Sequence, residues 1–147
     1  MAWVTITEAD VQTRLAGAEL SAYRTAAKAS GQSDPLTEII SAVVDEVRGY
    51  IAACDRNTLG AGQTVPSKLK SATLAVIRYK LVTRLPIAVN TERTTEYRDA
   101  IALLERTADC KFAIEEPATE SSEIIAGTRP SMGERTLTYN RDNQDGA

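Results

Sequence analysis

The segment between Val65 and Pro86 constrains the fold more than any other part of the sequence; it reads VPSKLKSATLAVIRYKLVTRLP. Prolines stand at its borders, and an advance of about 100° per residue spreads apolar side chains over most of a helix circumference. Only Thr73, Lys80 and Arg84 gather in a narrow polar strip. A helix that is apolar on nearly every side is buried among other helices. We therefore expect this segment to be the central helix of a bundle.

A second helix is predicted to begin at Asp34. This residue suits the N-cap, and Pro35 suits the first helical position, where its missing N–H is no loss. Apolar residues then recur at the spacings of three and four that mark an amphipathic helix. They are Leu36, Ile39, Ile40, Val43, Val47, Tyr50, Ile51 and Cys54. We assign the opposite, polar face to Asp45, Arg48 and Arg56.

The chain before these helices predicts a short extended lead followed by helical turns. Residues 3–6 are the extended lead, and Thr7 and Asp10 have the spacing of a capping box at a helix start. Gly17 is a predicted break. An alanine-rich stretch then continues as helix until Gly31 stops it.

A last helix is predicted from Thr94 or Thr95 to Ile114, after a polar connection. Its apolar seam consists of Tyr97, Ile101, Leu104, Ala108 and Phe112. The fold class is therefore all-α, with a small bundle of four to five helices that occupies residues 1–114.

Residues 115–147 differ in character and form a predicted C-terminal arm. Four glutamates fall between Glu115 and Glu123, and the polar sequence that follows cannot bury enough apolar area to fold by itself. Within it, Leu137 and Tyr139 alternate with threonines in a strand-like period. Two interpretations stay open: a disordered terminus, or an extended arm that forms a short strand on a partner subunit.

Composition excludes several kinds of function. A chain of 147 residues has the size of one domain, and its formal net charge of −3 gives no overall attraction to nucleic acid or anionic membrane. The absence of histidine removes the commonest general base and most zinc sites. No phosphate-loop, dinucleotide or nucleophile-elbow motif is present. We expect no catalytic residues, no cofactor and no metal.

Cys54 and Cys110 are too few and too far apart for a disulfide scaffold or a CxxC metal site. We therefore predict two reduced, partly buried thiols. The N-terminus lacks a secretory pattern, and no apolar run approaches the roughly 20 residues of a membrane span. A soluble protein made in a cytoplasm is the expectation.

A small helical DNA-binding or regulatory protein is an alternative function. Such a protein would contact phosphates through the basic residues of the 65–86 helix, which are Lys68, Lys70, Arg78, Lys80 and Arg84. Neither interleaved aromatic residues nor a helix-turn-helix glycine accompanies them, so a solvated rim is the simpler interpretation.

Four segments, in this order, resemble a family of small neck proteins of Mu-like tailed bacteriophages, grouped with head-tail connector or adaptor proteins. They are VTITEADVQTRL, LTEIISAVVDEVRGYIAA, VPSKLKSATLAVIRYKL and EYRDAIALLERTA, and together they extend to about Ile114. One departure follows Gly49 and Tyr50, where family members often have an aromatic or basic run and this chain has Ile51 to Cys54.

The resemblance implies a structural role in the virion neck, for a protein made in the bacterial host cytoplasm. Related adaptors form a homo-oligomeric ring, commonly dodecameric, below the portal protein. The ring extends the DNA channel toward a stopper or tail-completion protein. Genomic DNA would pass without sequence-specific binding, and no membrane is involved. Ring contacts are heterologous, so each bundle needs two different contact faces.

The candidate subunit-interface or portal contacts are Lys80, Arg84, Arg135, Leu137, Tyr139 and Arg141. Lys80 and Arg84 are expected to pair with carboxylates of the adjacent subunit, or with Asp45 and Glu46 of their own bundle.

Overall fold

The structure is a computed structural model that describes residues 2–29, 31, 34–84 and 88–118. These residues confirm the all-α prediction, with five α-helices and one two-stranded sheet among them. The elements in chain order are β1 (Trp3–Thr5), α1 (Glu8–Gln12), α2 (Gly17–Ala29), α3 (Pro35–Ala52), β2 (Thr64–Pro66), the single 3-10 turn η1 (Ser67–Leu69), α4 (Lys70–Thr83) and α5 (Thr91–Ala108).

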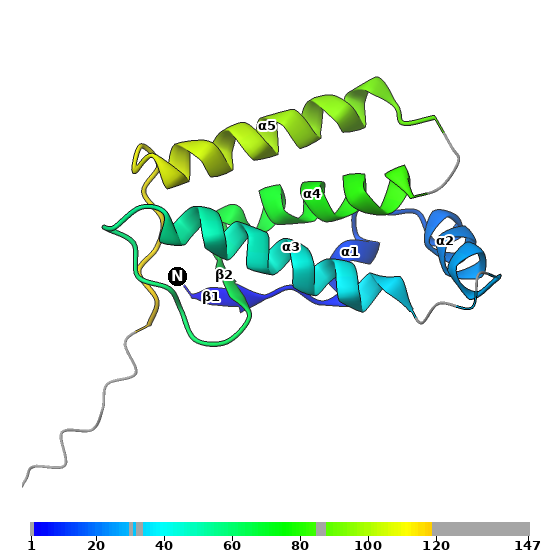
Figure 1. Cartoon of the computed structure of the whole chain (residues 1–147), viewed down its shortest axis with the longest axis horizontal. Helices are drawn as coiled ribbons and strands as arrows, with labels where there is room; N and C mark the ends of the chain where they lie inside the picture. The colour runs from blue at the N-terminus through cyan, green and yellow to red at the C-terminus, as the bar shows by residue number, and fades with distance from the viewer. Residues whose placement is uncertain (1, 30, 32–33, 85–87, 119–147) are drawn as a thin grey trace, which may run out of the picture.

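Helix α4 is the central helix, as its sequence predicts. It lies between α3 and α5 and also contacts α1 (Figure 1). Its buried residues lie on most sides of the helix and are Ala72, Thr73, Leu74, Ala75, Val76, Ile77, Leu81 and Val82. The helix begins later than predicted, because the residue before a proline favours an extended backbone and Val65 and Pro66 form β2 instead.

The predicted polar strip on this helix is wrong at Thr73, which is completely buried. Its hydroxyl donates a hydrogen bond to the Leu69 carbonyl oxygen at 2.8 Å. A threonine can satisfy its hydroxyl on the preceding helical turn in this way, so burial leaves no polar group unpaired. Lys80 is half-buried, and Arg84, just beyond the last residue of the helix, is exposed.

Helix α3 begins as predicted. The Asp34 side chain accepts a hydrogen bond from the Leu36 N–H, and Pro35 occupies the first turn. The prediction that Arg48 lies on the polar face of this helix, opposite the apolar stripe, is wrong. Its guanidinium donates to the carbonyl oxygens of Thr64 at 2.7 Å and Gly60 at 2.9 Å, so a long cation fills the space between α3 and the loop that leads to β2.

The N-terminal lead forms β1, which pairs antiparallel with β2 so that Val4 faces Val65. The Trp3 ring lies 6.0 Å from the Arg48 guanidinium. The capping box of Thr7 and Asp10 is confirmed, with both reciprocal hydrogen bonds present.

Helix α5 begins at Thr91, earlier than predicted, because Asn90 supplies the N-cap by accepting from the Glu92 N–H at 3.1 Å. It packs on α4, where the rings of Tyr79 and Tyr97 stack with centroids 4.0 Å apart. The helix ends at Ala108, so Phe112 lies beyond it and the predicted helical seam is too long.

The prediction of two reduced thiols is also wrong, because Cys54 and Cys110 form a disulfide with Cα atoms 5.4 Å apart. Helices α3 and α5 run in the same direction, antiparallel to α4, so their carboxyl ends meet at one end of the bundle (Figure 1). The two cysteines are therefore close in space although 56 residues separate them along the chain.

The structure describes only the first four residues of the predicted arm, 115–118. The Trp3 indole N–H donates to the Glu115 carbonyl oxygen at 2.9 Å, so the chain leaves the bundle beside β1. The division between bundle and arm after Ile114 stays a prediction. Within the described residues, no helix has the length and apolar character needed to cross a membrane.

Candidate functional site

Two of the predicted contact residues lie together at the carboxyl end of α4. Lys80 and Arg84 border a hollow of about 310 Å³ between α3 and α4. Its other lining residues are Ile39, Ala42, Val43 and Thr83. The hollow therefore has an aliphatic wall on α3 and a basic rim on α4. Arg135, Leu137, Tyr139 and Arg141 lie outside the described residues.

The two basic residues differ in their partners. Lys80 forms an ion pair with Glu46 on α3, which is one of the intramolecular partners expected for it. Arg84 makes no ion pair with any described residue, and its side chain is exposed beside the hollow. Of the two, Arg84 is thus the cation that is open to a partner molecule.

Tyr23 on α2 is buried near Arg84. Burial raises the pKa of its phenol above the ordinary value of 10.0, while the positive charge of Arg84 acts in the opposite direction. Within the described residues the hydroxyl has no hydrogen-bond partner of standard geometry. Arg84 therefore lies close enough to the Tyr23 phenol to favour its ionised form.

The remaining basic residues of the central segment point to different parts of the molecule. The Lys70 ammonium pairs with Asp10 at 2.6 Å, and the Lys68 ammonium donates to the Ala113 carbonyl oxygen at 3.3 Å. The hydrogen bond from the Lys70 ammonium is the largest cause that lowers the pKa of Asp10 to about 2. The hydrogen bond from the Thr7 N–H is the second largest. These lysines therefore join α4 to the N-terminal and C-terminal segments and form no common patch.

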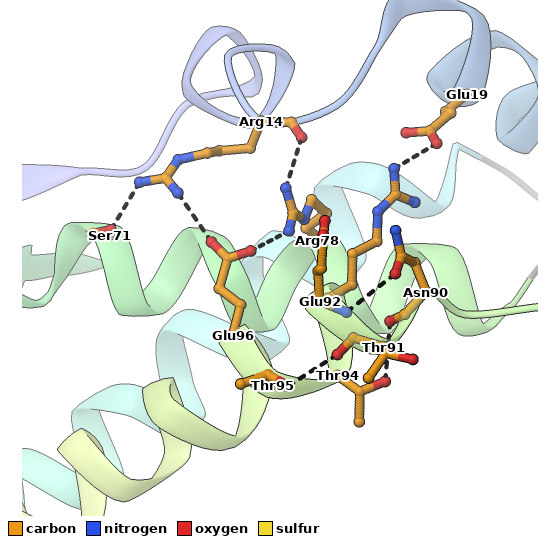
Figure 2. A network of polar contacts seen from close by, with 11 residues as sticks. Arg14, Glu19, Ser71, Arg78, Asn90, Thr91, Glu92, Thr94, Thr95 and Glu96 are labelled. Carbon is orange, nitrogen blue, oxygen red and sulfur yellow. Dashed lines mark hydrogen bonds and ion pairs between the residues drawn. The ribbon is translucent and has the colours of Figure 1, made fainter.

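A polar network around Glu96 connects three elements (Figure 2). Its carboxylate accepts from the Arg14 guanidinium at 3.1 Å and also pairs with Arg78. Arg14 donates to the Ser71 hydroxyl at 2.8 Å, and Arg78 donates to the Arg14 carbonyl oxygen at 3.4 Å. The segment after α1 is thereby fixed to both α4 and α5.

Helix α2 is held by further ion pairs. Arg93 of α5 contacts Glu19 at 2.7 Å, and Arg24 pairs with Glu8 and, at 3.2 Å, with Asp34. Partly exposed pairs of this kind contribute little singly, but α2 buries only Leu20 and Tyr23 and depends more on them than the core helices do.

Sequence reasoning missed these partners. The charges are visible in the sequence, but each pair joins elements that are distant along the chain, and no spacing rule connects them. The one local signal was the capping box, which placed Asp10 at the start of α1 where Lys70 reaches it.

The described residues contain no group of three or more carboxylate or cysteine side chains placed to hold a metal ion. The polar groups that gather do so as ion pairs between elements, and of the two cations that border the hollow only Arg84 has no carboxylate partner among the described residues.

Comparison with protein-family models identifies the family of this chain. A family model described as bacteriophage Mu, Gp36 matches residues 6–128, which is well over half of the chain. No curated protein matches the chain. The match covers the whole bundle from Ile6 and continues into the C-terminal arm. The chain belongs to the bacteriophage Mu Gp36 family and is a protein of a Mu-like phage.

Proposed function

We propose that this protein is a head-tail connector of a tailed bacteriophage, which forms a ring below the portal, extends the DNA channel and joins head to tail. Family membership supports a role in phage structure or morphogenesis. The observation that carries the narrower role is that the family match covers both the bundle and the start of the arm, the two parts that such a connector uses. The protein has no enzymatic role and needs no cofactor in this proposal.

The bundle offers different contact sites at its two ends. The carboxyl end of α4 presents Arg84 and the hollow beside it, whereas the chain leaves for the arm at the other end, near Trp3 and Glu115. Two unlike faces are what a heterologous, ring-closing contact requires. Arg84 is therefore assigned to a carboxylate of a neighbouring subunit or of the portal. Lys80 can take part in the same contact only if it leaves Glu46 and pairs with a carboxylate of the partner instead.

The arm residues Arg135, Leu137, Tyr139 and Arg141 are proposed as further contacts with the portal or a neighbouring subunit. Their alternating pattern suits strand addition, in which backbone hydrogen bonds give affinity and alternate side chains give specificity. The complete assembly would then lie in the virion neck, between the portal and a stopper or tail-completion protein, with no contact to a membrane.

The DNA-binding alternative receives less support from the same geometry. Lys70, Arg78 and Lys80 all lie on α4, and each forms an ion pair with a carboxylate of a different helix. Contact with phosphates would require breaking these pairs, and the net charge of −3 opposes it further. We expect little affinity for duplex DNA even at low salt, and a salt-sensitive complex in a DNA titration would favour the alternative.

Sedimentation and negative-stain imaging of the protein with its portal ring test the proposal. We expect an added tier on the portal. Arg84→Glu should weaken its formation about tenfold or more, as loss of one charge-assisted contact does. Arg98→Glu is the matched control, because Arg98 is exposed on α5 and does not line the hollow. A portal ring that sediments alone at high protein concentration would refute the connector role.

A further inference from the structure

The disulfide between Cys54 and Cys110 lies where solvent can reach it. The Cys54 residue is only 2% exposed, but Cys110 is an exposed residue. Both cysteines line an open hollow of about 190 Å³, together with residues of the two segments that follow α3 and α5. A small thiol can therefore enter the hollow beside the bridge, and access of this kind is a condition for exchange.

Cys110 also occupies a backbone position that favours glycine. It follows the C-cap of α5 with φ of +61°, and the N–H of Lys111 donates to the Arg106 carbonyl oxygen at 2.8 Å. The Cys110 N–H donates to Thr107 at 3.1 Å, which completes a Schellman motif. A side chain at this left-handed position adds strain that glycine would avoid. A cysteine at this position, unlike glycine, can form the disulfide with Cys54.

The bridge is the covalent anchor of the segment that leads into the arm. Beyond Cys110, Phe112 and Ile114 pack against the core. The chain is also held by the Trp3–Glu115 hydrogen bond and by Lys68, whose ammonium contacts Ala113 and whose N–H contacts the Glu115 carboxylate at 3.4 Å. The second carboxylate oxygen of Glu115 is buried with no partner among the described residues. All of these contacts are non-covalent, whereas the bridge ties the start of the segment covalently to Cys54.

We propose that Cys54 and Cys110 form a thiol–disulfide exchange site, a latch that a dithiol opens to release residues 110–118 from the bundle. The chemistry of the latch does not depend on the proposed connector role. Its use rests on that role: the open latch would let the arm reach a partner during assembly, and the closed latch would fix it.

The exchange balances in two steps. A thiolate of the dithiol attacks the Cys110 sulfur, the bond between the two cysteine sulfurs breaks, and Cys54 leaves as a thiolate that takes a proton from water. The second thiolate of the dithiol then attacks the other dithiol sulfur, which is bonded to Cys110 in the mixed disulfide. This bond breaks, and Cys110 leaves as a thiolate that takes a proton from water. The protein disulfide gains two electrons and two protons, and the dithiol becomes a disulfide. An oxidised dithiol drives the reverse reaction.

Trp3 reports the state of the latch, because it is the only tryptophan and it binds Glu115. The full-length protein is compared after treatment with oxidised and with reduced dithiothreitol, with thiol titration, tryptophan emission and trypsin cleavage after Lys111 as readouts. We expect free thiols, a red-shifted emission and about tenfold faster cleavage only in the reduced protein. Circular dichroism should show equal helix content in both.

Two variants separate the bridge from the turn. Cys54→Ser/Cys110→Ser should give the open signals under both conditions. Cys110→Gly removes the bridge but suits the left-handed position, so it should also open. The proposal fails if oxidised dithiothreitol leaves both thiols free, if emission and cleavage do not change on reduction, or if Cys110→Gly keeps the closed signals. Since none of these readouts involves the portal, failure of the connector role would leave the result on the latch intact.

Discussion

At the scale of single residues, Asp10 shows how one side chain serves two purposes. It completes the capping box of α1 with Thr7 and accepts the Lys70 ammonium from α4. Both interactions favour the charged carboxylate, which is why its pKa falls from 3.8 to about 2. The Asp10 carboxylate therefore stabilises the folded state above about pH 4, and this contribution is lost as the pH falls toward 2.

Lys70→Met tests this assignment. Without the ammonium, the pKa of Asp10 should rise from about 2 toward 3.8 but stay below it, because the Thr7 hydrogen bonds remain. An NMR pH titration of the Asp10 carboxyl measures the shift. Lys28→Met, a change at another lysine of the N-terminal half, is the control and should leave the Asp10 pKa near 2. An unchanged pKa in Lys70→Met would show that the pair does not form in solution.

Two buried hydroxyls should respond in opposite ways to removal. Tyr23→Phe deletes a hydroxyl without a described partner, so the free energy of unfolding should stay equal or rise slightly. Thr73→Val deletes the donor to Leu69 and should cost about 1 kcal/mol. Urea denaturation compares the two. A cost for Tyr23→Phe as large as that for Thr73→Val would mean that the phenol has a partner, such as Arg84 or water.

At the scale of elements, caps and apolar periods in the sequence predicted the helices, whereas the contacts between distant segments could not be predicted. The cap at Asp34 and the apolar period of α3 are local, and both are confirmed. The all-round apolar pattern placed α4 correctly at the centre. The pairing of β1 with β2, the Arg48 contacts and the disulfide each join distant segments. No rule based on the period or composition of one segment can show such pairings.

Glu96 provides the element-scale prediction, because it joins α5 to Arg14 and Arg78. The Arg78 side chain is only 17% exposed, so losing the carboxylate leaves a largely buried cation without its pair. Glu96→Gln should lower the free energy of unfolding by about 1–2 kcal/mol, between the values for exposed and buried pairs. Glu105→Gln, at an exposed position on the same helix, is the control. Equal urea midpoints for the two variants would contradict the role of the network.

At the scale of the whole molecule, the sequence supplied the fold class and the family, but only part of the site. Lys80 and Arg84 do lie together, yet Lys80 already has Glu46 as its partner. Net charge alone could not distinguish a cation that is paired within the bundle from one that is open to a partner. The four arm residues lie outside the described residues, and their contacts stay predictions.

The connector role is tested most directly by imaging phage particles made without this protein. A nonsense codon early in the gene is compared with wild type, and negative-stain micrographs give the fraction of heads joined to tails. We predict that heads and tails accumulate separately, and that wild-type protein supplied in trans restores joined particles. Normally joined, infectious particles in the absence of the protein would contradict the account.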